Sequence, residues 1–363
     1  MKSDVREPSA IALLERLEDE AYSDSVLFGQ QNAGHIGITL KRKDGTESDI
    51  KNLTGSNPGI VGIDTLSFYG YEGNMDDLVK TVKNLHKQGM IITLSSHMPN
   101  FSLGGDSFFD YSPNITDGDI GRRILPGGDL HAKYLRFLDD IASFASECVD
   151  LEGERIPMIF RPFHECNGDW FWWGGKNLSP EDYIKLFRFT IDYLRDEKGI
   201  KNFLYCYSPN GRIHSCESFM DRYPGDDYVD IMGVDQYDDR PEKDSGFFKD
   251  LICSLEYVGE CAQNRGKVYA LTEVGLRTLD SNPEGYFEGL APEGNRVPDW
   301  YSRLLEALLH CEAGLRCAYM LTWSNFSETQ FWVPYETEGF RHEMCDDFVR
   351  FCDDPHIKLA PAN

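Results

Sequence analysis

Eight short apolar segments, separated by stretches long enough for a helix, constrain the fold of this chain more than any other feature. The expected strands cover residues 25–31, 60–64, 90–95, 156–160, 203–207, 229–235, 268–273 and 317–323. Short, unbroken apolar runs are typical of strands buried on both faces of a parallel sheet. Parallel neighbours need a long crossover, usually a helix. The pattern therefore predicts an α/β fold.

Helical spacing of apolar residues occurs in most of the stretches around these segments. The expected helices cover residues 1–20, 75–88, 131–149, 180–196, 247–264, 300–313 and 341–352. Eight strands alternating with helices predict a closed (β/α)8 TIM barrel. An open doubly wound sheet is the alternative, but no Gly-rich phosphate motif follows the first strand. Because there is no internal repeat or Pro/Ser-rich linker, we expect residues 1–363 to form a single domain.

Two segments do not fit the alternation. Residues 35–58 carry glycine and charge, and we interpret them as an insertion for which a small hairpin is one interpretation. Residues 100–129 read as a long polar loop.

The formal net charge of −25 excludes several classes of partner. Nucleic acid, anionic membranes and anionic polysaccharides would all be repelled, whereas a neutral polymer is compatible. No stretch approaches the ~18 apolar residues of a membrane span. Charges interrupt any signal-peptide core in the first twenty residues. The protein is therefore either intracellular or a mature form whose leader is not part of this sequence. Of the two we expect a secreted protein, and we expect a monomer.

Ten cysteines are present, and none forms a C-x-x-C pair. A zinc ribbon or a thioredoxin-type motif is therefore not indicated. In an oxidising compartment, Cys206 and Cys216 could form a disulfide bond.

Residues 156–174 carry the strongest functional signal. An apolar strand leads within a few residues to Arg161, His164 and Glu165, and then to four aromatic residues. Sugars offer hydroxyl groups to charged planar groups and flat C–H faces to aromatic rings, so this stretch predicts a carbohydrate site. The structural alternative is a core strand followed by an aromatic loop that merely packs. The aromatic residues are Trp170, Phe171, Trp172 and Trp173.

Catalytic residues of a barrel come from the C-terminal ends of its strands. Glu165 and Glu273 end the fourth and seventh expected strands, on opposite sides of the barrel mouth, where their carboxyl groups could meet across a sugar. Retaining glycosidases place two carboxyl groups about 5–5.5 Å apart. An ion pair of Glu273 with Arg161 or Arg277 is the structural alternative. The other polar or aromatic strand ends are Gln31, Asp64, His97, His164, Asn210, Asp235, Tyr237 and Trp323.

Metal and serine chemistry are less well supported. His97, His164, Glu165 and Asp235 could supply ligands, but the chain has no H-E-x-x-H spacing. There is also no G-x-S-x-G elbow. We expect no metal and no cofactor.

Three motifs carry a family resemblance. They are Arg161-Pro162-Phe163-His164-Glu165 with the following Asn167-Gly168 and residues 170–174, then residues 223–230 with 233–237, and finally Leu271-Thr272-Glu273. They resemble glycoside hydrolase family 26, most members of which are endo-acting β-1,4-mannanases. The resemblance extends over the expected barrel strands from Phe28 to Trp323.

The resemblance implies a retaining mechanism with Glu165 as general acid/base and Glu273 as nucleophile. It implies that Tyr237 hydrogen-bonds the nucleophile and that Trp323 is the platform under the sugar at subsite −1.

Further roles follow from the same resemblance. His164 would shape the catalytic network, Trp170 would border the plus subsites, and His97 would bind sugar on the minus side. The complete set of substrate-binding candidates is His97, Arg161, His164, Trp170, Trp173, Asp235, Tyr237 and Trp323.

The leading hypothesis is an endo-β-1,4-mannanase acting on mannan, glucomannan or galactomannan. Two alternatives stay open. The same chemistry could act on β-1,3-xylan or mixed-linkage β-glucan, or the chain could be a non-catalytic carbohydrate-binding protein on this scaffold.

Overall fold

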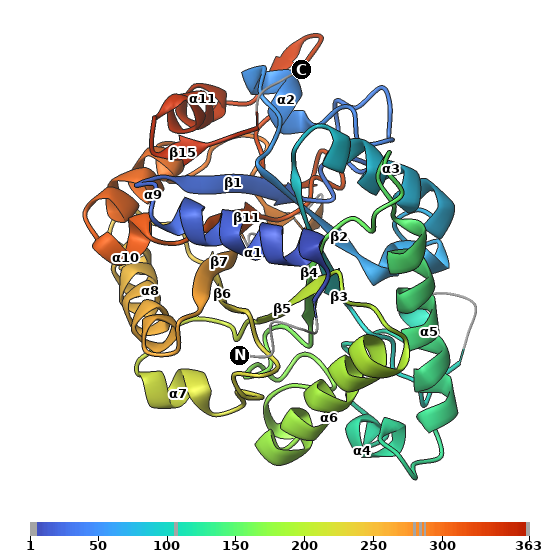
Figure 1. Cartoon of the computed structure of the whole chain (residues 1–363). Helices are drawn as coiled ribbons and strands as arrows, with labels where there is room; N and C mark the ends of the chain where they lie inside the picture. The colour runs from blue at the N-terminus through green and yellow to red at the C-terminus, as the bar shows by residue number, and fades with distance from the viewer. Residues whose placement is uncertain (1–5, 105–107, 279–280, 283–284, 287, 361–363) are drawn as a thin grey trace.

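Eight parallel strands close into a barrel at the centre of the molecule (Figure 1). The computed structural model describes residues 6–360 except 105–107, 279–280, 283–284 and 287. Neighbouring strands pair in the order β11-β7-β6-β5-β4-β3-β2-β1, and β1 pairs with β11 to close the barrel. These strands are β1 (Val26–Gln31), β2 (Ile60–Asp64), β3 (Ile91–Ser96), β4 (Met158–Pro162), β5 (Phe203–Tyr207), β6 (Ile231–Asp238), β7 (Val268–Leu276) and β11 (Tyr319–Thr322). The predicted TIM barrel is confirmed.

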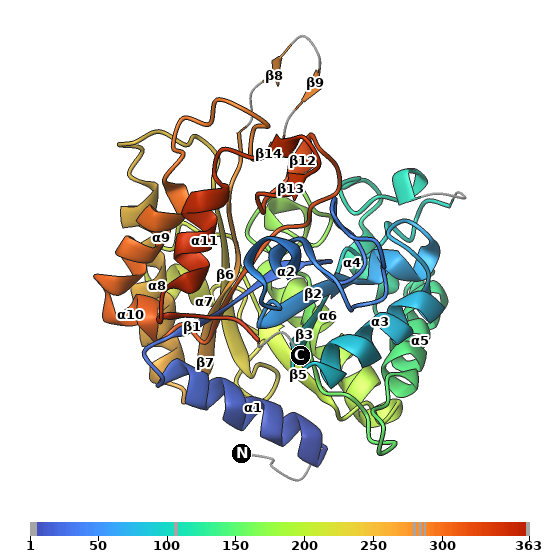
Figure 2. The ribbon, with the colours of Figure 1, turned by 90° about the horizontal axis from the view of Figure 1, so that it is seen from above.

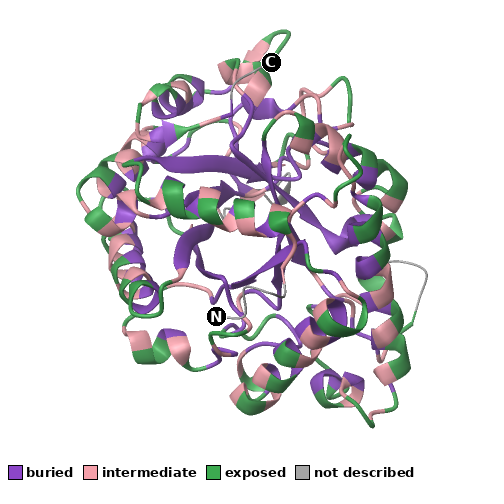
Figure 3. Cartoon of the chain, in the orientation of Figure 1, coloured by how far each residue is buried: buried purple, intermediate pink, exposed green. Residues whose placement is uncertain are grey.

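Helices surround the barrel and turn their buried faces towards it (Figure 3). The longer ones are α1 (Pro8–Ala21), α3 (Met75–Lys87), α5 (His131–Glu147), α6 (Pro180–Asp192), α8 (Phe247–Gln263), α9 (Trp300–Leu309) and α11 (Cys345–Asp353). Shorter ones are α2 (Asp49–Thr54), α4 (Ile120–Ile124), α7 (Cys216–Met220) and α10 (Glu312–Leu315). No helix in the described part of the chain is long and apolar enough to cross a membrane.

The N-terminal helix α1 closes one end of the barrel. Its buried Ala10, Leu13 and Leu17 form one apolar cluster with residues from the starts of the barrel strands, such as Leu27 and Ile60. Figure 2 shows α1 lying at one end of the molecule, with short strands from the loops after β7 and β11 at the other. The C-terminal ends of the barrel strands are therefore left open to form a site.

These loops carry β8 (Ser281–Asn282), β9 (Gly285–Tyr286), β10 (Glu288–Gly289), β12 (Gln330–Phe331), β13 (Glu336–Thr337) and β14 (Phe340–Arg341). The pairing of β10 with β12 joins the loop after β7 to the loop after β11. A last short strand, β15 (Ile357–Lys358), pairs with β1.

The hairpin interpretation of residues 35–58 is wrong, because this segment contains helix α2. Ser48 caps its N-terminus by accepting a hydrogen bond from the Lys51 backbone N–H, and Gly55 ends it in the left-handed conformation. The Asp49 carboxylate accepts the backbone N–H groups of Ile38 and Thr39, at 3.0 and 2.8 Å. A buried carboxylate, not strand pairing, therefore organises the insertion.

Residues 100–129, predicted to be a long polar loop, also contain a short helix, α4. The cysteine pairing is different too. Cys216 forms a disulfide bond with Cys261 of α8, whereas Cys206 is a free, buried residue of β5.

Candidate active site

A cleft of about 360 Å³ lies at the open mouth of the barrel. Seven of the ten predicted site residues line it. They are His97, His164, Glu165, Trp170, Tyr237, Glu273 and Trp323. Another five lining residues are Asn114, Phe171, Arg277, Glu288 and Trp332. Arg161, Asp235 and Trp173 are not in its lining and are almost completely buried.

The chain leaves β4 through an unusual backbone turn that presents Glu165. Phe163 and Glu165 both have a positive φ of 53°, a left-handed conformation that residues other than glycine seldom adopt. The Glu165 backbone N–H donates to the Ser208 carbonyl at 2.7 Å, which ties the turn to the end of the neighbouring strand. The turn brings the Glu165 side chain into the cleft.

The Glu165 carboxyl group occupies an environment that favours its protonated form. Burial, followed by the negative charge of Glu273, raises its pKa to about 7. Arg277 and the hydrogen bond from the Trp170 indole N–H, at 2.6 Å, act in the opposite direction. A carboxylic acid that holds its proton near neutral pH can serve as a general acid.

Glu273, at the end of β7, is held by two donors. The Arg161 guanidinium forms a buried ion pair with one of its oxygens, and the Tyr237 hydroxyl donates to the other at 2.7 Å. Burial and then Glu273 raise the pKa of Tyr237 far above its ordinary value, so the phenol keeps the proton that it donates. Arg161 is the partner named in the structural alternative for Glu273. Glu273 therefore both forms this ion pair and lines the cleft, so the two interpretations do not exclude each other.

Arg161 and Asp235 form the support beneath Glu273. Arg161 Nη1 donates to Asp235 at 2.7 Å, and the Thr272 hydroxyl donates to the other Asp235 oxygen at 2.5 Å. With relative exposures of 1% and 0%, Arg161 and Asp235 lie beneath the cleft surface. They orient the carboxylate and do not form part of the surface that faces a ligand.

Carboxylate oxygens of Glu165, Asp235 and Glu273 lie within 4.8 Å of one another. Such a group of oxygens could in principle hold a cation. Here Arg161 is bonded to both Asp235 and Glu273, so a fixed positive charge already stands between these two carboxylates. The donor set therefore fits a pair of reacting carboxyl groups better than a metal site.

Two histidines form the wall next to the carboxyl groups of Glu165 and Glu273. The His97 ring donates a hydrogen bond from Nδ1 to the Asp64 carboxylate, at 2.8 Å. Its centroid lies 4.6 Å from that of the His164 ring and 5.9 Å from that of the Trp323 ring. Burial lowers the pKa of His164 well below its ordinary value, and Arg161 adds to this effect, so His164 is neutral. Because the bond to Asp64 uses Nδ1, the other ring nitrogen of His97, Nε2, is not engaged by Asp64.

The aromatic loop after Glu165 divides into an exposed and a buried part. Trp170 is 40% exposed, whereas Trp172 and Trp173 are buried. The prediction that Trp173 contacts substrate does not fit its position, because Phe171 stacks on it at 4.4 Å. Its indole N–H donates to the His164 carbonyl at 2.8 Å, so the ring can be buried without an unpaired donor. Trp173 supports the site from behind.

Some of the lining residues could not have been selected from the sequence. Glu288 and Trp332 come from loops without strand or helix periodicity, and the β10–β12 pairing brings these loops together. The Glu288 carboxylate accepts a hydrogen bond from Gln330 at 3.0 Å across this pair. The available signal was a tryptophan within the stretch Phe331-Trp332-Val333, beside an otherwise polar loop.

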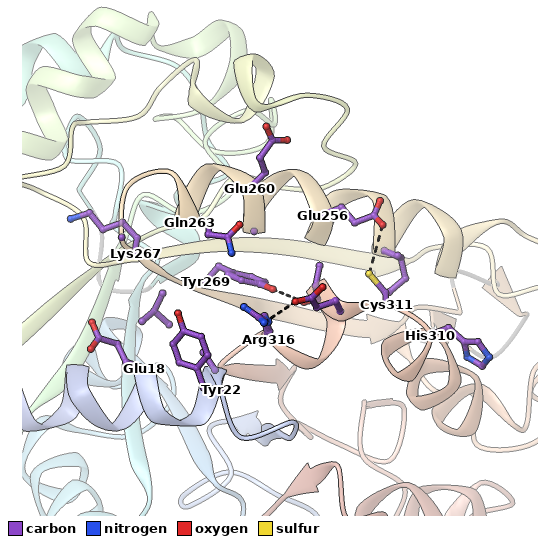
Figure 4. A pocket seen from close by; sticks show the side chains of 17 residues that line it. Glu18, Tyr22, Glu256, Glu260, Gln263, Lys267, Tyr269, His310, Cys311 and Arg316 are labelled. Atoms are coloured by element: carbon purple, nitrogen blue, oxygen red, sulfur yellow. Dashed lines mark hydrogen bonds and ion pairs between the residues drawn. The ribbon is translucent and has the colours of Figure 1, made fainter.

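A larger cavity, of about 810 Å³, lies between α1, α8 and α10 (Figure 4). It is lined by charged and polar side chains, among them Glu18, Glu260 and Arg316, around the exposed Tyr22 ring. None of the predicted site residues borders it. Cavity size is therefore a poor guide here, because the carboxyl pair lies in the smaller cleft.

Comparisons with known proteins agree with this geometry. The profile of Glycosyl hydrolase family 26 matches residues 9–283. A mannan endo-1,4-β-mannosidase of Bifidobacterium adolescentis is 34% identical over 328 residues, which cover 87% of this chain and 31% of that protein. One of Bacillus subtilis strain 168 is 30% identical over 244 residues, covering 64% of this chain and 62% of that protein. The chain thus spans less than two thirds of the length of these relatives.

Solved structures show the same similarity over nearly the whole chain. The catalytic domain of the Bacillus sp. JAMB-750 family 26 endo-β-1,4-mannanase superposes with a TM-score of 0.89 at 38% identity, covering 98% of this chain and 93% of that one. A modular endo-β-1,4-mannanase from Cellulomonas fimi gives 0.87 at 34% identity, covering 99% and 77%. The barrel, the carboxyl pair and the matching profile lead to one conclusion: the chain belongs to glycosyl hydrolase family 26.

Proposed function

We propose that the protein is a retaining endo-β-1,4-mannanase that hydrolyses mannan, glucomannan or galactomannan. The observation that carries the proposal is the pair Glu165 and Glu273, which have oxygens within 4.8 Å of each other and clearly different environments. A close pair is typical of retaining glycosidases, whereas inverting enzymes keep the carboxyl groups about 6.5–9.5 Å apart to admit a water. We propose mannan as the substrate because two relatives are mannan endo-1,4-β-mannosidases and two similar structures are endo-β-1,4-mannanases.

In the first step, the Glu273 carboxylate forms a bond to the anomeric carbon while the bond from that carbon to the leaving oxygen breaks. Glu165 gives its proton to the leaving oxygen. In the second step, Glu165 takes a proton from water, the water oxygen attacks the anomeric carbon, and Glu273 is released. The Tyr237 hydroxyl keeps the nucleophile oriented, and Arg161 holds it from below.

The remaining lining residues supply sugar contacts. We propose Trp323 as the platform at subsite −1, with His97 on the minus side and Trp170 on the plus side. His97 presents a ring nitrogen that Asp64 does not use, and Trp170 presents an exposed indole face. Aromatic faces pack on the C–H surface of a sugar and favour the positively polarised ring of the transition state. Trp173, Arg161 and Asp235 act by supporting these groups.

We propose that the enzyme works outside the cell, because a polysaccharide chain cannot enter it. The disulfide bond between Cys216 and Cys261 is consistent with an oxidising compartment.

The test is release of reducing ends from linear mannan, glucomannan, galactomannan, β-1,3-xylan and mixed-linkage β-glucan, with Glu273→Ala as the blank. We expect release from the mannans and none from the variant. Release from xylan or glucan alone would keep the catalytic pair and overturn the substrate. If the folded wild-type protein released nothing from any of them, the binding-protein alternative would replace the enzyme.

A second experiment tests the stereochemistry of the reaction. Proton NMR of the first product formed from a short manno-oligosaccharide should show retained β configuration. An α product would overturn the retaining mechanism.

A further inference from the structure

Arg277 occupies a position that the proposed mechanism does not yet use. It follows β7 directly, four residues after Glu273, and its backbone N–H donates to the Asp238 carbonyl at 2.9 Å. Its guanidinium carbon lies 4.4 Å from the centroid of the Tyr237 ring, and Nε donates to Asp239 at 2.6 Å. Its side chain is 31% exposed and lines the catalytic cleft.

Structural stabilisation alone is a weak reason for this placement. A partly exposed ion pair such as Arg277–Asp239 contributes little to the stability of the fold, and so does a cation over an aromatic ring at an exposed site. The ring beneath Arg277 is the one whose hydroxyl group holds the proposed nucleophile. The guanidinium thus contacts the support of one catalytic carboxyl group and shares the cleft with the other.

We propose that Arg277 is a positioning residue for both catalytic carboxyl groups. It packs on Tyr237, which keeps that hydroxyl directed at Glu273, and its positive charge stabilises the carboxylate that Glu165 becomes after it donates its proton. The inference rests on the proposed function, because it assigns Arg277 to the same two steps.

The chemistry explains why such a charge is useful. During the first step the proton leaves Glu165 while the negative charge of Glu273 disappears into the new covalent bond. Until that bond is formed, two negative charges share a partly buried cleft, which is costly. A guanidinium fixed by Asp239 and Tyr237 lowers this cost without transferring a proton itself, since arginine stays charged.

Several other groups face the Glu165 carboxyl and would affect its titration. From β6 and β7 they are Asp235, Tyr237 and Glu273; from β4 and its turn they are Arg161 and the neutral His164; and from the surrounding loops they are Arg277 and Glu288. Arg161 is engaged by Asp235 and Glu273. Arg277 instead pairs with Asp239, which is not one of the two proposed catalytic carboxyl groups. Its ion pair can therefore be removed by mutation without changing Glu165 or Glu273.

The test compares pH profiles of kcat/KM on linear mannan for Arg277→Met, Arg277→Lys and Asp239→Asn. Loss of the positive charge in Arg277→Met should move the alkaline limb to higher pH by about half a unit or more. Asp239→Asn removes a negative charge and should move the limb to lower pH. Arg277→Lys keeps the charge and should leave the limb close to that of the wild type, while losing part of the stacking on Tyr237. Shifts of opposite sign are a result that simple loss of packing does not produce.

Arg212→Met is the matched control, because Arg212 is 62% exposed and pairs with Asp250 at 3.2 Å. We expect no shift from it. Thermal unfolding of each variant establishes that the protein is folded. An aryl β-mannoside with a good leaving group needs little acid assistance. If Glu165 is the titrating group, kcat/KM on this substrate should therefore fall much less at alkaline pH than kcat/KM on mannan.

The outcome that overturns the inference is a uniform loss of kcat/KM in Arg277→Met with an unmoved alkaline limb, or a limb that moves to lower pH. Either would leave the proposed function intact. Failure of the proposed function has a different signature, namely a wild-type protein that is folded and inactive on mannan at every pH.

Discussion

Glu165 and Glu273 are the same type of residue at the ends of two strands, and their neighbours give them different environments. Burial and the charge of Glu273 raise the pKa of Glu165, while the hydrogen bond from the Trp170 indole lowers it; the resulting pKa is about 7. Glu273 accepts hydrogen bonds from Arg161 and Tyr237. Two carboxyl groups in such different environments are typical of an acid/base and nucleophile pair.

Replacing Glu165 with alanine removes the proposed proton donor and leaves the proposed nucleophile, Glu273. We expect kcat on mannan to fall by about 10²–10⁴-fold, the usual contribution of general acid catalysis. On an aryl β-mannoside with a good leaving group, formation of the covalent intermediate should be spared, and a burst of the phenol should be visible by stopped-flow absorbance. Equal losses on both substrates would contradict the acid assignment.

The pKa of Glu165 also predicts the pH dependence of the wild-type enzyme. The general acid must be protonated, so activity is present below its pKa and is lost as the pH rises through it. We therefore expect the alkaline limb of kcat/KM on mannan to have its midpoint near pH 7. Initial rates between about pH 5 and about pH 9 at low substrate concentration measure it. Full activity well above this midpoint would assign the acid role to another group.

Among the elements, the segment between β4 and α6 does most to shape the cleft. It carries Glu165 and Trp170, and its backbone is held by side chains of the same segment. The Asn177 side-chain amide donates to the carbonyls of Asp169 and Phe171, both at 2.9 Å. Trp173 adds a bond from its indole to the His164 carbonyl. An exposed tryptophan can thus keep a defined orientation on a loop.

We expect Asn177→Ala to loosen this loop without unfolding the barrel. Loss of two hydrogen bonds should reduce kcat/KM on mannan by about threefold to tenfold, equivalent to about 1 kcal/mol. The fluorescence of Trp170 should become more sensitive to an added quencher. Lys176→Ala is the control, because Lys176 is 76% exposed and its ion pair with Asp169 is solvent-accessible. If both variants behaved like the wild type, the amide would have no role in holding the loop.

On the scale of the whole molecule, the barrel separates stability from function. The end closed by α1 has an apolar interior, with Leu13 and Leu17 packed on the starts of the strands. The other end collects the polar and aromatic residues of the cleft. Parallel strands produce this separation because all their C-terminal ends meet at one edge.

Leu17→Ala should therefore destabilise the protein and leave its chemistry nearly unchanged. The side chain is completely buried, and truncation of a buried leucine costs about 3 kcal/mol in the free energy of unfolding. Urea unfolding followed by tryptophan fluorescence measures this value, and kcat on mannan at low temperature should stay within about twofold of the wild type. Glu15→Ala on the exposed face of α1 is the control. A cost below about 1 kcal/mol would mean that α1 does not seal the barrel.

The regular part of the fold was predictable because the barrel strands are buried on both faces. Segments such as 60–63 and 203–207 lack any charged residue, and the structure has strands over these residues. The insertion was not predictable in this way, since a single buried carboxylate, Asp49, organises it through hydrogen bonds from the backbone of Ile38 and Thr39, which have no regular spacing from it. The N-cap Ser48 and the C-terminal Gly55 of α2 were nevertheless readable signals.

The sequence by itself determined the alternation of strands and helices, and with it the edge at which Glu165 and Glu273 would meet. It did so because strand burial and helix periodicity are local properties, and because the chain order of parallel strands places their ends. Only the tertiary structure decided which tryptophans face the cleft, that Arg161 lies beneath it, and that loops far apart in the chain supply Glu288 and Trp332. Those outcomes depend on packing and hydrogen bonds between segments that have no fixed spacing in the sequence.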